Sequence, residues 1–156
     1  MFGGCGRIAF DPDRDASVDG LSCADVYCLD PSLGGDGIVS VDVGGVDNLN
    51  FGYRALAVLP DDGLVIAGQG GSPGATDLVA VQLTEAGSRD ASFGVGGVAS
   101  VDAGGTDERA ISVALAPDGR ILLAGATGPT TLAGVIARLR PDGQLDPTFD
   151  GDGTLS

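Results

Sequence analysis

The amino-acid sequence predicts an all-β fold made of four-stranded antiparallel, blade-like repeats of the β-propeller type, with about two and a half units in the chain. One phrase recurs along the chain: "FGVGGVASVD" at 93–102 resembles "LGGDGIVSVD" at 33–42, and shorter versions stand at 2–11 and 149–156. Each full unit also holds four strand-like segments. In addition, the turn-forming residues are abundant, with 28 glycines and 20 aspartates, whereas lysine is absent. Together these features predict many short strands joined by tight turns.

The repeat sets the expected domain organisation. Asp30, Asp90 and Asp146 begin successive units, so the periods are 60 and 56 residues. Periods of this length are typical of solenoids, propellers and arrays. The sequence therefore divides into a degenerate partial repeat (1–28), two full units (29–88 and 89–144) and the start of a further repeat (145–156).

The number of units is too small for a closed ring, because propellers have about 4–8 blades. Residues 1–28 lack the hairpin sequence of the full units, so they are either a degenerate half-blade or a surface insertion. An open array leaves strand edges unpaired. We therefore expect that the sequence is a fragment of a longer chain, that the protein self-associates, or that its strands adopt a more compact arrangement.

Four segments in each full unit are expected to be short strands. The first two alternate between apolar and polar residues, which is typical of half-buried strands. The third is a continuous apolar run, consistent with a strand buried on both faces. In chain order the segments are Ile38–Asp42, Tyr53–Leu59, Leu64–Ala67 and Leu78–Leu83 in one unit, and Val98–Asp102, Ala110–Ala116, Ile121–Ala124 and Val135–Leu139 in the next.

Hairpin turns are predicted between the second and third segments, at "PDDG" (60–63) and "PDG" (117–119), and a further "PDG" stands at 141–143. Proline presets φ for a turn, and Asp-Gly supplies the positive φ of a tight hairpin. These hairpins favour blades over a β-solenoid. The Gly-rich stretch "GQGGSPG" (68–74) lacks the lysine and the following helix of a phosphate loop, so a flexible connection is expected there.

The recurring phrase is interpreted as a structural joint, a Gly-rich turn and strand that lead the chain from one blade to the next. Phe93 and Phe149 are expected to anchor the core between blades, and Val101 to point into the interface between sheets.

These residues also resemble a known family. The combination of "LDPSLGGDGIVSVD", then "ALAVLPDDGLVIAG" or "SVALAPDGRILLAG", then "VIARLRPDGQLDPTF" is similar to the delta-60 repeat family of bacterial β-propeller-like proteins, over Leu29–Ser156. The resemblance implies tandem repeats, an extracellular or cell-surface location, and no assigned catalytic residues. It adds support for the fold and little for an activity.

Charge and hydropathy exclude several classes of partner. The net charge of −14, with eight arginines as the only basic side chains and no histidine, disfavours nucleic acid and anionic lipid. No apolar stretch is long enough to span a membrane, so no membrane insertion is expected. Met1–Phe10 lacks the pattern of a signal peptide. The partner is therefore expected to be an unidentified protein or glycan, bound at a propeller face or at loops such as Gly70–Asp77 and Thr127–Gly134.

The three cysteines, Cys5, Cys23 and Cys28, do not define a compartment. Their odd number, their spacing and the absence of histidine argue against a zinc site. Two alternatives stay open: a Cys23–Cys28 disulfide in a secreted protein, or unpaired thiols that pack as small apolar side chains.

One segment has a metal-like pattern. In "LDPTFDGDGT", Asp146, Asp150 and Asp152 offer hard oxygen ligands followed by glycine, as in an acidic calcium loop. Against this, no glutamate follows, and Gly34 and Gly94 replace Asp150 in the other copies. We therefore expect no cofactor, with Ca²⁺ at these three aspartates as the alternative to plain turn-capping.

Two functions follow from the sequence. The first is a non-enzymatic repeat scaffold or binding module of a larger surface or secreted bacterial protein. The second is a calcium-dependent propeller hydrolase or adhesion module. The sequence favours the first, because without histidine a Ser–His–Asp or Cys–His arrangement cannot be assembled, and no catalytic residue is predicted.

Overall fold

The computed structural model describes residues 29–43, 55–128 and 133–156. The chain divides into two units, Met1–Asp30 and Pro31–Ser156, and the strands of the described residues belong to the second. The predictions made for 1–28, the partial repeat and the three cysteines, lie outside the described residues. Among the described residues, no helix has the length and hydropathy needed to cross a membrane.

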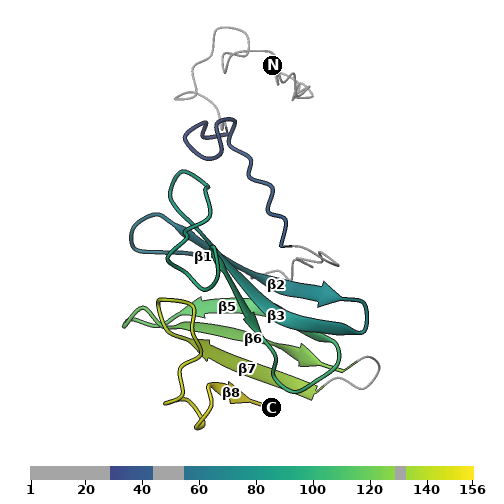
Figure 1. The fold of residues 1–156 in the computed structure, drawn as a ribbon. Helices are drawn as coiled ribbons and strands as arrows, with labels where there is room; N and C mark the ends of the chain where they lie inside the picture. The colour runs from purple at the N-terminus through teal and green to yellow at the C-terminus, as the bar shows by residue number, and fades with distance from the viewer. Residues whose placement is uncertain (1–28, 44–54, 129–132) are drawn as a thin grey trace, which may run out of the picture. The chain divides into compact units, whose positions relative to one another are not determined.

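The second unit is all-β and contains two four-stranded antiparallel sheets (Figure 1). In each sheet the strands follow one another in chain order, β1-β2-β3-β4 in the first sheet and β5-β6-β7-β8 in the second. This topology is that of consecutive propeller blades, and it confirms the predicted fold class. The strands are β1 (Leu56–Val58), β2 (Leu64–Ser72), β3 (Ala75–Leu83), β4 (Val98–Val101), β5 (Glu108–Leu115), β6 (Ile121–Thr127), β7 (Ala133–Leu139) and β8 (Thr154–Leu155).

The sheets do not coincide with the sequence repeats. The first sheet takes three strands from the unit 29–88 and its fourth strand, β4, from the following unit, because β4 pairs with β3. The second sheet is completed in the same way, since β8 comes from 145–156 and pairs with β7. Each blade is thus closed by the first strand of the next repeat, as expected of a joint.

Two predictions of secondary structure are wrong. The segment Ile38–Asp42 is not a strand, since residues 38–43 have no ladder partner among the described residues. Gly68–Gly74 is not a flexible connection. It continues β2 into a hairpin in which Ser72 pairs with Ala75, and only Pro73 and Gly74 form the turn. Gly71 adopts a φ of 127°, and a Cβ there would lie 2.6 Å from the carbonyl oxygen of Ala75, so the sequence uses glycine to bring the strands together.

The "PDDG" and "PDG" hairpins have the same backbone. In the first, the Leu59 N–H donates to the Gly63 carbonyl at 2.7 Å. In the second, the Ala116 N–H donates to the Arg120 carbonyl at 2.8 Å. Each turn contains one residue with positive φ, Asp62 at 63° and Gly119 at 81°. The predicted turn chemistry is confirmed, and it sets the strand register on either side.

Apolar residues form two clusters. The larger lies between the sheets and joins residues of the first sheet and its joint (Val65, Ala67, Leu78, Ala80, Phe93, Ala99 and Val101) to residues of the second sheet (Ala110, Val113, Ile121, Leu123, Val135, Ala137 and Leu139). The two sheet surfaces that carry these residues and face each other are called the shared faces. The smaller cluster lies on the opposite side of the first sheet, here called its far face, and contains Val79, Val81 and Leu83. Val39, Val41 and Val43 cover the far face.

Phe93 is the largest fully buried side chain and belongs to the larger cluster. It is 0% exposed, and Val101 of the same cluster is 2% exposed, so both lie in the interface between the sheets as predicted. The turn that carries Phe93 also contacts the second sheet, because the Gly94 N–H donates to the Asp142 carbonyl at 2.8 Å. Its counterpart Phe149 is only half-buried and is not part of either cluster, so the prediction that Phe149 anchors the core is wrong; the Arg138 guanidinium, 4.9 Å from the ring centroid, packs against it instead.

Candidate functional site

Asp146, the first of the predicted calcium ligands, holds a structural ion-pair network. Its side chain is 3% exposed, and Oδ2 lies 2.8 Å from the Nε atoms of both Arg120 and Arg138. Oδ1 accepts hydrogen bonds from the Thr148 hydroxyl at 2.7 Å and from the Thr148 N–H at 3.1 Å. The Thr148 hydroxyl bond is the main cause that lowers the pKa of Asp146, with the two arginines assisting and burial opposing.

Asp150 and Asp152 lie in the turn that precedes β8. Oδ1 of Asp152 accepts hydrogen bonds from the Thr154 N–H at 2.8 Å and from the Thr154 hydroxyl at 2.9 Å, and this lowers the pKa of Asp152. Asp150 is exposed and adopts a positive φ of 50°. Two of the three predicted ligands, Asp146 and Asp152, thus close turns of the segment with their side chains. The calcium hypothesis for them stays a prediction.

The abundance of aspartate has a structural account in the described residues. Eight aspartates accept a hydrogen bond from the backbone N–H two residues later, the geometry of an Asx turn. Asp90, for example, accepts from the Ser92 N–H at 2.9 Å and from its hydroxyl at 2.7 Å, and these bonds lower the pKa of Asp90. The eight are Asp36, Asp61, Asp90, Asp102, Asp118, Asp142, Asp146 and Asp152.

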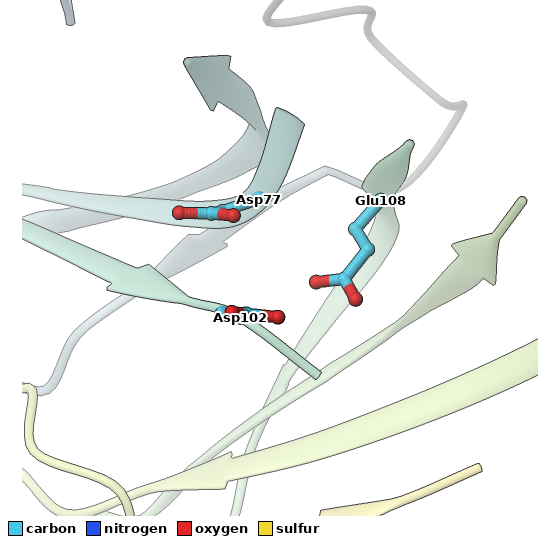
Figure 2. A group of neighbouring side chains, drawn as sticks. All are labelled: Asp77, Asp102 and Glu108. Atoms are coloured by element: carbon cyan, nitrogen blue, oxygen red, sulfur yellow. The ribbon is translucent and has the colours of Figure 1, made fainter. Parts of the chain in front are cut away.

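Within the described residues, a different trio brings its carboxylate oxygens close enough to share one cation. Asp77, Asp102 and Glu108 each offer an oxygen within 4.8 Å of the others (Figure 2). We call this trio the carboxylate group. Asp77 lies on β3, Asp102 follows β4, and Glu108 begins β5, so the group forms where the chain passes from the first sheet to the second. All donors are hard oxygens, which suit Ca²⁺ or Mg²⁺ rather than a softer metal.

Glu108 has its own structural task in this group. Its side chain is buried, with the residue 1% exposed, and its two oxygens accept hydrogen bonds from the N–H groups of Ala103 at 2.8 Å and Gly105 at 2.6 Å. Its carbonyl oxygen accepts from the Thr76 hydroxyl at 3.1 Å. Glu108 therefore fixes the connection between the two sheets, which explains a buried carboxylate without a cation.

The remaining carboxylates of the group are more accessible. Oδ2 of Asp77 accepts a hydrogen bond from the Ser100 hydroxyl at 2.9 Å, and Oδ1 of Asp102 accepts from the Gly104 N–H at 2.8 Å. Sequence analysis did not single out this trio, because its members are far apart in the chain and the aspartates are two among 20. The one available signal was Glu108 itself, one of only two glutamates in the chain.

Of the two loops expected to bind a partner, the structure describes one in full and the other in part. Gly70–Asp77 forms the tip of the β2–β3 hairpin, where Ser72, Pro73 and Gly74 are exposed. For the second loop, Thr127–Gly134, residues 129–132 lie outside the described part.

Comparison with known proteins supports the fold. Residues 116–149 match the model of a family described as a domain of unknown function (DUF5122) beta-propeller. The matched part runs from the hairpin before β6 to the turn that contains Phe149. No curated protein and no solved structure matches the chain significantly. The family match and the two sheets together support a β-propeller-like repeat protein with an incomplete set of blades.

Proposed function

We propose that the chain is a non-enzymatic scaffold or binding module built from propeller-type repeats of the delta-60 kind, at the bacterial surface or in secreted material. The observation that carries this proposal is the structural use of the acidic side chains. Asp146 is held by two arginines and a threonine, Glu108 binds the connection between the sheets, and most described aspartates close their own turns. Carboxylates used in this way stabilise a framework.

The β2–β3 hairpin supports a binding role. Its tip is exposed, yet its shape is set by a two-residue turn and by Gly71 and Gly74, whose φ values are 127° and 79°. A loop held rigidly at the end of a sheet presents side chains to a partner at little cost in entropy. Because the chain is strongly acidic, the proposed partner is a neutral or basic protein surface or a glycan.

The second candidate is a calcium-dependent adhesion module or hydrolase, and a calcium titration followed by thermal melting separates the two. A cation that binds the folded protein with a Kd of about 10 µM stabilises it by about 2.7 kcal/mol at about 1 mM. For a scaffold without a metal, the melting temperature stays the same in CaCl₂ and in MgCl₂ at equal ionic strength.

The control variants are Asp150→Asn, which alters the predicted calcium loop, and Asp77→Asn, which alters the carboxylate group. A melting temperature that rises with CaCl₂ and loses this rise in either variant would replace the scaffold proposal by the calcium-dependent one. It would also show which carboxylates hold the ion.

A further inference from the structure

The two sheets present equivalent faces, of which one is covered and the other is open. "PDDGLVIAG" and "PDGRILLAG" align Val65 with Leu122 and Ala67 with Ala124. The strand pairing supports this alignment. In the first sheet Ala67 pairs with Ala80 and Ala80 with Ala99, and in the second sheet the equivalent row is Ala124 with Ile136 and Ile136 with Leu155. The open face of the second sheet is therefore defined by Leu122, Ala124, Ile136 and Leu155.

Exposure differs sharply between the two faces. In the first sheet, Val65, Ala67 and Ala80 are 0% exposed because the second sheet covers them. On the open face, Leu155 is 45% exposed, Ala124 is exposed, and Leu122 and Ile136 are half-buried. The open face carries larger apolar side chains than its covered counterpart, so water contacts more apolar surface there.

Two equivalent backbone contacts hold the packed layers of this unit together. The Gly94 N–H donates to the Asp142 carbonyl at 2.8 Å where the second sheet meets the joint. At the far face of the first sheet, the Gly34 N–H donates to the Ala86 carbonyl at 3.1 Å. Gly34 and Gly94 occupy the same position of the recurring phrase, with φ values of 67° and 54°. The same backbone contact therefore brings residues 31–43 onto the first sheet and the first sheet onto the second.

A third copy of this contact surface is present at the open face. Asp150 stands at the position of Gly34 and Gly94 and has the same left-handed backbone, with a φ of 50°. Next to it, Phe149 stands at the position of Phe93 but is only half-buried, with the Arg138 guanidinium 4.9 Å from its ring centroid. The turn is thus shaped for the contact that its two counterparts make.

The chain itself contains the surface that fits. "LDPTFDGDGTLS" at 145–156 repeats "LDPSLGGDGIVS" at 29–40, with seven of twelve positions identical. Residues 31–43 cover the far face of the first sheet, through Val39, Val41 and Val43. The related segment at 145–156, already paired to β7, borders the open face.

We propose that the open face of the second sheet docks onto the far face of the first sheet in a second copy of this chain, in a head-to-tail arrangement. In this assembly the joint at 145–156 of one copy takes the place that residues 31–43 hold in the other. The inference rests on the proposed scaffold role and concerns how copies of the scaffold assemble, separately from the neutral or basic partner proposed for the β2–β3 hairpin. Because both copies are acidic, the association is expected to strengthen with salt.

The test is the mass of the purified protein by sedimentation over a range of concentration and NaCl. We expect the 15.3 kDa monomer to convert to dimers and larger species as either rises. Ile136→Asp places a charge on the open face and should reduce association at least tenfold. The matched control is Val95→Asp, because Val95 is 85% exposed and lies off that face. Should Ile136→Asp unfold the protein, Leu155→Asp on the two-residue edge strand replaces it.

Amide hydrogen exchange tests the geometry. On association, exchange should slow at Leu122 and Ile136 and accelerate at Val39–Val43, because that segment is displaced. A monomer under all conditions, or equal association of both aspartate variants, would overturn the proposal, as would slower exchange at the open face with unchanged exchange at Val39–Val43. None of these results bears on the calcium titration, so failure of the inference is distinct from failure of the scaffold proposal.

Discussion

Phe93→Ala offers the most direct test of how the two sheets are held together. The Phe93 ring is 0% exposed and lies in the cluster formed by both shared faces. A Cβ at Gly143 would lie only 3.1 Å from Phe93 Cδ2, so the backbone of the Pro141–Gly143 turn packs against the ring. Backbone of a tight turn cannot move in to fill the space, and truncation should leave a cavity.

The expected loss is large. Phe→Ala at a fully buried site costs about 3–5 kcal/mol in the free energy of unfolding. For a chain of this size, each kcal/mol lowers the melting temperature by about 2–4 °C, so Phe93→Ala should lower it by about 10 °C. Urea unfolding followed by far-UV circular dichroism measures the loss in free energy of unfolding, and a thermal scan measures the change in melting temperature. Both use a protein concentration at which sedimentation gives the mass of the monomer.

Phe149→Ala is the matched control, since Phe149 occupies the same position of the recurring phrase. Its ring is half-buried and lies under the Arg138 guanidinium, a contact worth about 0.5–1 kcal/mol at an exposed site. We expect Phe149→Ala to cost about 1–2 kcal/mol, including its partial burial. Equal losses for the two variants would refute the conclusion that Phe93 joins the sheets.

Two further predictions concern the buried carboxylates. The pKa of Asp146 is lowered from 3.8, so its contribution to stability is present above that value and is lost as the pH falls through the lower pKa of the folded state. Asp146→Asn should therefore reduce the fall in the free energy of unfolding with pH, measured by urea unfolding from pH 7 to pH 2. An unchanged pH dependence at the acid end would contradict the ion-pair network. Glu108→Gln leaves only one oxygen for the N–H groups of Ala103 and Gly105 and should cost about 1.5–3 kcal/mol. The more accessible Asp77→Asn should cost less than about 1 kcal/mol in the same urea measurement, and the reverse order would be inconsistent with our account.

The sequence carried enough information for the strands and turns because each has a local cause. The "PDDG" and "PDG" turns preset the backbone of their hairpins, and alternation places one side of each strand in the core. Phe93 could be assigned to the interface because a large apolar side chain recurs in the phrase among glycines. The family match over residues 116–149 covers one such hairpin with its two strands and the turn that follows.

The errors have non-local causes. Ile38–Asp42 has the alternation of a strand, but a strand also needs a hydrogen-bonded neighbour, which local pattern does not reveal. Gly68–Gly74 was predicted to be flexible from its glycine content, which does not reveal the strand that these glycines pair with. Three of them lie in the β2 ladder, where Gly68, Gly70 and Gly71 pair with β3.

The candidate site shows the same limit. Glu108 and Asp77 are 31 positions apart, and only the pairing of the two sheets with their connection brings them together. Conversely, Asp146, Asp150 and Asp152 are close in sequence, yet Asp146 and Asp152 each close a separate turn, and Asp150 is an exposed residue with positive φ. Sequence spacing indicated metal-ligand chemistry there but could not show that two arginines form ion pairs with Asp146.

The offset between repeats and sheets determines where this protein can be cut or recombined. A boundary at Ser88, where the sequence repeat ends, would remove β4 from the first sheet and Phe93 from its core. A boundary after Val101 keeps the sheet whole. Exchange of modules between such proteins is therefore expected to keep each sheet whole when the crossover follows the strand of the joint, so the natural module of the architecture is the interval from the end of one joint to the end of the next.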